Sequence, residues 1–342
     1  MLNLDGIKTV LSSPKKIVIT THSRPDADAL GSSLGLMLLL QKQGHEVVTI
    51  SPTEYPDFLK WMKGENEVIV FNNGQQEKSK ELVKNADLIF CLDFSALSRI
   101  DDLGVLVGAS SADKVLIDHH LEPEDFAKYV LHSTDAASTA ELVYEFICNI
   151  DGCDLIDSDI AECLYAGINT DTGSFRHSNV TKTVFDVSAA LVERGADTAK
   201  VAKLIYDTNS ENRLRLIGYA LSENLKVMNG LNTAYFALSE KILRKFNAQM
   251  GDTEGLVNYA LSIKGIKLAA LFKEAEDGVK ISFRSVNDFS VNDLARKHFN
   301  GGGHKNAAGG KSELSLDETV KKFEGLLNDY KQELIGDKVN HD

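Results

Sequence analysis

The first half of the chain alternates short, continuously apolar runs with longer stretches that repeat apolar residues at helical spacing. The runs are rich in β-branched residues, a composition typical of strands buried on both faces of a parallel sheet. They read KIVIT (16–20), EVVTI (46–50), EVIVF (67–71), DLIFCLD (87–93) and KVLID (114–118). Helical patterns at 28–43 and 78–85 lie between them. The alternation predicts an α/β fold whose mostly parallel sheet has helices on both faces.

Helical patterns dominate the middle of the chain. The sequence STAE at 138–141 has the signature of a capping box, and a further helix is expected from about 158 to 168. From 185 to about 228 the pattern stays helical, with RGAD at 194–197 as a break. We therefore expect a first domain over residues 1–190 and a helical connector over 191–228.

Strand-like segments return in the last third of the chain. They are NTAYFAL (232–238), KLAALFKE (267–274) and VKISFRS (279–285), and they alternate with amphipathic stretches at 252–263, 291–298 and 317–334. This order predicts a smaller α/β domain over residues 229–342. A length of 342 residues agrees with two domains, because it exceeds the usual range of a single one.

Composition is that of an ordinary globular protein, with 43% hydrophobic and 25% charged residues. No apolar run approaches the ~20 residues of a membrane helix, and the N-terminus lacks the pattern of a secretory signal. We therefore expect a cytoplasmic protein that has no membrane partner. The net charge is −13 and no Lys/Arg block stands out, which argues against binding of long nucleic acid.

The 4 cysteines form no CxxC pair and lie mostly within apolar patterns. They are Cys91, Cys148, Cys153 and Cys163. We expect reduced, largely buried thiols, and neither a zinc knuckle nor a disulfide framework.

Acidic and histidine side chains gather where the predicted strands end. In order along the chain they are His22, Asp26, Asp28, Asp93, Asp118, His119 and His120, and Asp171 follows an apolar helix in GINTDTGSF. The carboxyl ends of parallel strands meet at one edge of a sheet, where ligands of open α/β proteins bind. Taken singly, each residue has a simpler explanation, since Asp28 could cap a helix, Asp93 could begin a turn, and a lone histidine is commonly structural.

Taken jointly, so many carboxylates would repel one another unless a cation neutralised them. Carboxylate oxygens with a minority of imidazoles suit Mn²⁺ or Mg²⁺, and the histidines favour Mn²⁺, whereas a zinc site more often recruits cysteine. The number of donors exceeds the need of one ion. Two ions that share a carboxylate form the arrangement used for in-line displacement at phosphorus, so hydrolysis of a phosphoester or phosphoanhydride is the leading chemistry.

The chain resembles the DHH phosphoesterases that carry a C-terminal DHHA1 domain. HSRPDADALGSS is similar to the first motif of that family, CLDFS to the second, IDHH to the third and GINTDTGSFRHS to the fourth. GGGHKNAAGG (301–310) is similar to the DHHA1 signature, although Asn300 stands where many relatives have a further glycine. The resemblance covers nearly the whole chain.

The resemblance implies a centre of two Mn²⁺ ions, with Mg²⁺ as the alternative. One ion would be held by His22, Asp26 and Asp93, and the second by Asp28, Asp93, His119 and Asp171. Asp93 would therefore be shared. His120 would face the substrate, where it stabilises the transferring phosphoryl group or assists the leaving oxygen, and Asp118 would orient the site.

The second domain is expected to hold the rest of the substrate. Gly301, Gly302 and Gly303 fit a backbone cradle for an anionic group beside His304, although a glycine triplet alone also suits a flexible turn. Arg284 matches the substrate-binding arginine of the family, with a solvated surface arginine as the alternative. Arg176 is a weaker candidate, because it could simply pair with a nearby carboxylate.

The compact two-domain layout is similar to that of nano-RNase/pAp phosphatases. The expected substrates are thus very short oligonucleotides and 3′-phosphoadenosine-5′-phosphate (pAp). The alternatives are a phosphodiesterase for the dinucleotide pApA or a cyclic dinucleotide, a pyrophosphatase of the related two-domain type, and a non-enzymatic nucleotide-binding adaptor. The pyrophosphatase would lack the GGGH turn, and an adaptor would need no shared carboxylate. A homodimer is left open.

Overall fold

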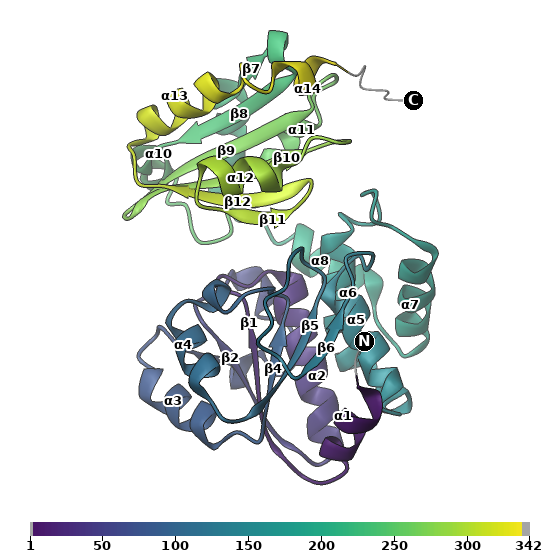
Figure 1. Cartoon of the computed structure of the whole chain (residues 1–342). Coiled ribbons are helices and arrows are strands. Elements are labelled where there is room, and N and C mark those ends of the chain that lie inside the picture. Colours follow the sequence, from purple (N-terminus) through teal and green to yellow (C-terminus); the bar gives the residue numbers. More distant parts are fainter. Residues whose placement is uncertain (1–2, 337–342) are drawn as a thin grey trace. The chain divides into compact units, whose positions relative to one another are not determined.

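The computed structural model describes residues 3–336 and divides into two compact units, Met1–Thr208 and Asn209–Asp342 (Figure 1). Each unit is built around its own sheet of 6 strands. The prediction of an α/β fold with a mostly parallel first sheet and a smaller α/β second part is confirmed.

The first sheet is entirely parallel and has the strand order β3-β2-β1-β4-β5-β6. Its strands are β1 (Lys16–Thr21), β2 (Glu46–Ser51), β3 (Ile69–Val70), β4 (Leu88–Leu92), β5 (Asp113–Asp118) and β6 (Tyr129–His132). Two differences from the sequence pattern concern its edges. The apolar run at 67–71 forms a strand over only two residues, and β6, whose apolar run YVL (129–131) is short, was not predicted.

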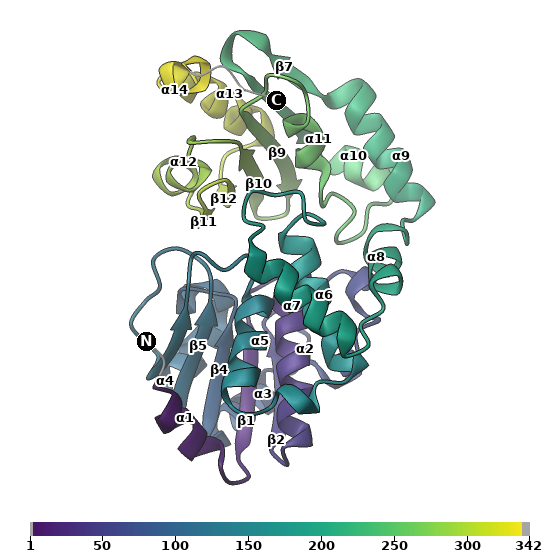
Figure 2. The same cartoon turned by 90° about the vertical axis from the view of Figure 1, so that its right-hand side faces the viewer.

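Side chains of each central strand alternate between two hydrophobic cores, as the pleat of a buried strand requires. Ile17 and Ile19 of β1 point into one core, and Val18 points into the other. The first core is completed by α2 (Ala27–Lys42), α5 (Thr139–Asn149) and α6 (Ser158–Asp171), with α1 (Leu4–Leu11), α7 (Lys182–Glu193) and α8 (Thr198–Tyr206) farther out (Figure 2). The second core is closed by α3 (Gln76–Asn85) and α4 (Asp101–Ala109).

Two glycines allow α2 and α6 to pack against each other at very short range. A Cβ atom at Gly31 would lie 2.3 Å from the carbonyl oxygen of Cys163, and one at Gly35 would lie 2.9 Å from the Leu164 side chain. A real Cβ atom cannot lie 2.3 Å from a backbone oxygen, whereas the Leu164 side chain opposite Gly35 could shift. Gly31 is therefore the residue that permits the close approach of the helices that carry Asp28 and Asp171.

The second sheet has the order β11-β12-β10-β9-β8-β7, in which only β8 and β9 pair in parallel. Its strands are β7 (Lys226–Met228), β8 (Thr233–Leu238), β9 (Leu268–Ala275), β10 (Gly278–Ser285), β11 (Gly302–His304) and β12 (Ala307–Ser312). Its helices are α9 (Glu211–Tyr219), α10 (Glu240–Lys245), α11 (Leu256–Leu261), α12 (Val291–His298), α13 (Leu316–Leu326) and α14 (Lys331–Ile335). The amphipathic stretch at 317–334 thus forms two helices where one was expected.

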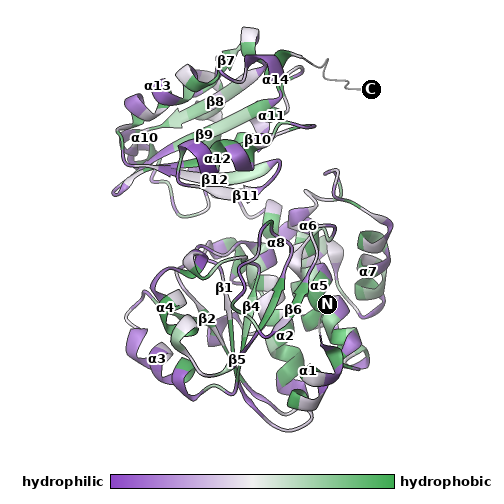
Figure 3. Cartoon of the chain, in the orientation of Figure 1, coloured by the Kyte–Doolittle hydropathy of each residue, from purple (hydrophilic) through white to green (hydrophobic). Residues whose placement is uncertain are grey.

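Apolar residues are concentrated in the strands and inner helices, whereas α3 on the outside of the first unit is largely hydrophilic (Figure 3). Within residues 3–336 no helix combines the length and the apolar character that crossing a membrane requires.

The prediction of four reduced cysteines is wrong for one pair. Cys148, at the end of α5, forms a disulfide with Cys153 in the turn that follows. Because the two residues lie close together in sequence, the short turn brings them into contact without any CxxC motif. Cys91 and Cys163 are free and buried, as predicted.

Candidate metal centre

The strand ends bring the predicted acidic and histidine residues together on the first unit. Their possible ligand atoms fall into three groups within which all lie inside 4.8 Å of one another. The groups are His22, Asp26 and Asp93; Asp28, His119 and Asp171; and Asp93, Asp118 and His120. Every residue of the predicted centre therefore lies in at least one group.

Asp93 lies at the middle of this arrangement. Its Oδ2 atom is 3.4 Å from Nε2 of His22, whereas its Oδ1 atom is 3.5 Å from Nε2 of His119. The two oxygens of one buried carboxylate therefore face two different histidines. Asp93 has φ +64, a left-handed conformation that is uncommon for a residue other than glycine and that occurs preferentially at functional sites.

His22 and Asp26 are held by local hydrogen bonds. Nδ1 of His22 lies 3.0 Å from the carbonyl oxygen of Ser23, which can only accept, so the proton is on Nδ1 and Nε2 faces Asp93. Burial acts to lower the pKa of His22, but Asp93 and Asp26 outweigh it and raise the value. Asp26 caps α2 through one oxygen, and its other oxygen lies 4.0 Å from His22 Nε2.

Asp28 is fully buried where α2 meets the first turn of α5. Its two oxygens accept hydrogen bonds from the backbone amides of Thr139, at 2.7 Å, and Ala140, at 2.9 Å. A Cβ atom at Gly167 would lie 2.6 Å from Asp28 Oδ1, so α6 has room for this carboxylate only because residue 167 is glycine. Burial, followed by the charge of Asp93, raises the pKa of Asp28 well above its usual value. A neighbouring cation would offset the free-energy cost of keeping the buried Asp28 carboxylate ionised.

His119 joins Asp28 to Asp171, the last residue of α6. Its Nε2 atom is 3.4 Å from Asp171 Oδ2 and 3.8 Å from Asp28 Oδ2. Nδ1 of the same ring lies 3.3 Å from the carbonyl oxygen of Ala136, which directs Nε2 toward the carboxylates. Burial lowers the pKa of His119, so its ring favours the neutral form that a metal ligand needs.

His120 is oriented by a buried carboxylate. Its Nδ1 atom donates to Oδ1 of Asp118 over 2.8 Å, and Asp118 itself is fully buried. His132, on the edge strand β6, donates from Nε2 to the backbone oxygen of His120 over 2.6 Å. This support was not predicted, because β6 carries no sequence signal that places it beside the IDHH segment.

Thr139 is the site residue that sequence reasoning missed. Its hydroxyl donates to Asp93 Oδ1 over 2.8 Å, while its amide binds Asp28. The segment STAE was interpreted only as a capping box, and half of that box forms: Ser138 Oγ accepts from the Glu141 amide, but the Glu141 side chain accepts from Ala137. The STAE segment was therefore recognised in the sequence, but it was assigned to helix initiation alone.

The glycine segment of the second unit forms an edge strand. Gly302, Gly303 and His304 make up β11, which pairs with β12. A Cβ atom at Gly301 would lie 2.0 Å from the carbonyl oxygen of Gly309, and one at Gly303 would lie 2.5 Å from that of Ala307. These glycines permit a close approach of two backbones.

The segment forms part of a strand and not the alternative of a turn, and the Gly303 amide donates to Oδ1 of Asn292 over 2.9 Å. Asn300 has φ +44, so asparagine here adopts the left-handed conformation that glycine would favour.

The two candidate arginines have different surroundings. Arg284, on β10, is half-buried and donates from one guanidinium nitrogen to the carbonyl oxygen of Phe283. Arg176 is exposed and donates from Nε to the carbonyl oxygen of Gly173, within its own turn.

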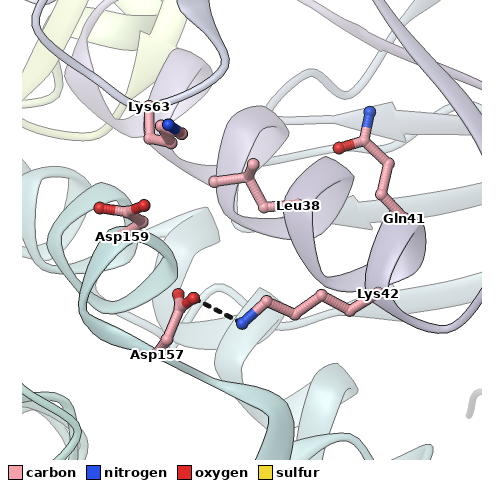
Figure 4. Close-up of a pocket in the computed structure, with 6 residues that line it drawn as sticks. All are labelled: Leu38, Gln41, Lys42, Lys63, Asp157 and Asp159. Carbon is pink, nitrogen blue, oxygen red and sulfur yellow. Dashed lines mark hydrogen bonds and ion pairs between the residues drawn. The ribbon is translucent and has the colours of Figure 1, made fainter.

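A separate pocket of about 350 Å³ lies between α2 and α6 on the first unit (Figure 4). An ion pair between Lys42 and Asp157 crosses its edge, and Lys63 and Asp159 also line it (Figure 4). None of the predicted site residues lines this pocket.

Comparison with known proteins identifies the family of the chain. Residues 16–168 match the N-terminal domain of the DHH family, and residues 232–333 match the DHHA1 domain. The chain belongs to the DHH family. Its resemblance to phosphoesterases with a DHHA1 domain is thereby confirmed, as is the prediction of a hydrolase.

Relatives of known name cover nearly the whole chain of this DHH protein. A bifunctional oligoribonuclease and PAP phosphatase NrnA of Thermus thermophilus is 32% identical over 93% of this chain and 90% of that protein. A cyclic-di-AMP phosphodiesterase GdpP of Geobacillus thermodenitrificans is 29% identical over 95% of this chain but only 49% of that protein. The crystal structure of an exopolyphosphatase-related protein from Bacteroides fragilis matches with a TM-score of 0.91 and 41% identity over 97% of each chain.

Proposed function

We propose that this DHH protein is a Mn²⁺-dependent phosphoesterase that hydrolyses very short oligoribonucleotides to mononucleotides and pAp to AMP. The observation that carries the proposal is the position of Asp93, whose two carboxylate oxygens face His22 and His119 separately. A carboxylate in that position is suited to hold two ions at a fixed spacing. The NrnA relatives, with their names as oligoribonuclease and PAP phosphatase, support the choice of substrates.

The proposed ligands form two sets that share Asp93. One set is His22, Asp26 and Asp93, and the other is Asp28, Asp93, His119 and Asp171. Four carboxylates and two imidazoles favour Mn²⁺, with Mg²⁺ as the alternative. When bound, two such ions polarise phosphoryl oxygens and lower the pKa of an attacking water.

His120 is proposed to act on the substrate. Because Asp118 accepts a hydrogen bond from Nδ1, the ring orientation is fixed and Nε2 remains for the phosphoryl group or the leaving oxygen. Asp118 is a positioning residue, since its contact is with His120 and not with the substrate.

The second unit is proposed to bind the part of the substrate that is not cleaved. Arg284 offers a guanidinium group that suits a phosphate, and His304 ends the strand that contains the glycine segment. Gly301 and Gly302 complete this proposed surface. Arg176 remains a weaker candidate on the first unit.

A second candidate function is the hydrolysis of pApA or cyclic di-AMP. It is favoured by the similarity to GdpP, which extends over 95% of this chain. The chemistry would be the same, and only the choice of substrate would differ.

The test is a comparison of rates with Mn²⁺ on pAp, pApA, cyclic di-AMP, pyrophosphate and end-labelled RNAs of increasing length. We expect turnover of pAp, and RNA cleavage that is fastest from dinucleotides to about pentanucleotides, a range that the resemblance to nano-RNases implies. The direction of this trend is supported by the net charge of −13 and by a sequence without a Lys/Arg block that could hold further phosphates. Salt is held fixed, since screening would flatten the trend. Rates that stay constant or rise with length would contradict the proposal, and exclusive turnover of cyclic di-AMP would favour the second candidate.

A further inference from the structure

Two arginines of the first unit carry exposed positive charge beside the acidic centre. Arg24 lies in the loop after β1, close to His22, and Arg99 lies in the 3₁₀ turn Leu97–Ile100 after β4. Within residues 3–336 neither guanidinium makes a hydrogen bond or an ion pair, whereas Arg194 on the same unit pairs with Asp154. Among these residues, neither guanidinium is therefore engaged in a direct contact with a carboxylate.

The loops that carry the two arginines are tied together by hydrogen bonds. The amide of Ser23 donates to the carbonyl oxygen of Arg99 over 2.9 Å, and the hydroxyl of Ser23 donates to Asp101. The amide of Arg24 donates to Oγ1 of Thr53 over 2.6 Å. Loops from β1, β2 and β4 thus hold both arginine backbones in fixed positions next to His22.

Arg24 adopts a backbone conformation that its residue type disfavours. Its φ is +58, in the left-handed region where glycine or asparagine is the usual choice. Such conformations persist where surrounding contacts enforce them, and they gather at functional sites. This strained position lies in the loop that also carries the candidate metal ligand His22.

The charges around the centre create a need for such cations. Five carboxylates gather there, from Asp26, Asp28, Asp93, Asp118 and Asp171, in a chain of net charge −13. Two divalent ions would engage the phosphate that is cleaved, and a nucleotide substrate carries further phosphate, for which Arg284 is the proposed partner on the second unit and Arg176 only a weaker candidate on the first. Arg176 directs Nε into its own turn, so Arg24 and Arg99 are the better-placed donors on this unit.

We propose that Arg24 and Arg99 form a phosphate-binding site beside His22, which takes a phosphate of the substrate other than the one that is cleaved. The inference rests on the proposed function and names a feature by which that site selects its substrate. The ligand class is a phosphate group attached to a nucleoside. The planar guanidinium group suits it, because two N–H groups can bind two phosphate oxygens at once.

The test compares hydrolysis of pApA with that of ApA, which lacks the 5′-phosphate. Arg24→Gln and Arg99→Gln are measured beside wild type, and Arg194→Gln serves as the control because it removes a half-buried, paired arginine from the same unit. In the two site variants, kcat/KM for pApA should fall about tenfold or more, while the value for ApA changes less than about twofold. Arg99→Lys should lose less kcat/KM for pApA than Arg99→Gln, because lysine keeps the positive charge but lacks the paired N–H donors of the guanidinium group.

An equal loss on both dinucleotides, or no loss on either, would overturn the inference. Failure of the proposed function gives a different result, since wild type would then hydrolyse neither dinucleotide. In that case, calorimetric measurement of adenosine 5′-phosphate binding to the same proteins still tests whether the two arginines bind phosphate. The inference requires weaker binding by Arg24→Gln and Arg99→Gln and wild-type affinity in Arg194→Gln, and equal affinity in all four proteins would contradict it.

Discussion

The carboxylate of Asp28 accepts a hydrogen bond of 2.7 Å from the backbone amide of Thr139, a residue far away in the sequence. The hydroxyl of Thr139 donates to Asp93 over 2.8 Å. One residue at the start of α5 therefore holds both the proposed shared ligand and a ligand of the second ion. The amino end of a helix is suited to this task, because its unpaired amides and its dipole favour negative charge.

Thr139→Val should lower activity without unfolding the protein. Valine keeps the shape and the backbone amide, so Asp28 remains bound, but Oδ1 of Asp93 loses its donor. Loss of one hydrogen bond to a charged group is worth about 1.5–3 kcal/mol, so kcat with Mn²⁺ should fall about tenfold or more. Thr139→Ser is the matched control and should stay close to wild type. Equal kcat values for the valine and serine variants would show that the hydroxyl does not orient Asp93.

The strands that support the centre were predictable, because each is a continuous apolar run that fills two cores. The strand at 88–92, for example, sends Phe90 into one core and Cys91 into the other. The edge strand β6 was missed because its apolar run, YVL at 129–131, is shorter than the runs of the central strands, and only Tyr129 of its residues is buried. The strands β11 and β12 were missed for a different reason. Glycines in GGGHKNAAGG usually indicate a loop, but here they allow two backbones to pair.

The proposed ligand residues could be selected from the sequence because parallel strands end at one edge and the motifs resemble those of a family; the structure brings them close together. The residues that hold these ligands in position were not predictable, since their roles depend on contacts between segments that are distant in sequence. Thr139 binds Asp93 across a wide separation in sequence, and His132 binds the backbone of His120 from an edge strand. The Cys148–Cys153 disulfide was missed because it is a local turn contact that carries no motif.

Gly31→Ala should destabilise the protein, because the new Cβ would lie 2.3 Å from the carbonyl oxygen of Cys163. Overpacking of this kind costs about 1–3 kcal/mol in the free energy of unfolding. Gly218→Ala on α9 is the control, since a Cβ there meets nothing within 4 Å. It should stabilise by about 0.5–1 kcal/mol through helix propensity. Urea unfolding measures the free energy of unfolding of both variants. A Gly31→Ala protein as stable as wild type would disprove the close packing of α2 on α6.

Thiol titration at pH 8 should find no reactive cysteine in the native protein. Burial raises the pKa of both Cys91 and Cys163 to about 12, so neither forms the reactive thiolate at that pH. Unfolding without reductant should expose only these two free cysteines, and prior reduction should release all 4. Four reactive thiols in the unfolded, unreduced protein would show that Cys148 and Cys153 are not joined.

Arg284→Ala and His304→Ala should impair substrate binding while leaving Mn²⁺ affinity intact. Both residues belong to the second unit, whereas every proposed ligand belongs to the first. We expect KM for pAp to rise about tenfold, the scale of one lost charged hydrogen bond, with a smaller effect on kcat. Arg244→Ala, which removes an exposed arginine paired with Glu240, should have no effect. Weakened Mn²⁺ binding in either site variant would contradict the division of roles.

The most direct test of the account is a calorimetric titration of Mn²⁺ into metal-free wild type and Asp93→Ala, with turnover of pAp measured on the same samples. Because the two oxygens of Asp93 face different histidines, its loss should disturb both ion sites together. We predict two ions per chain in wild type, and in Asp93→Ala weakened binding at both sites with turnover at background. An Asp93→Ala protein that binds two ions with wild-type affinity and retains substantial turnover would contradict the shared-carboxylate centre.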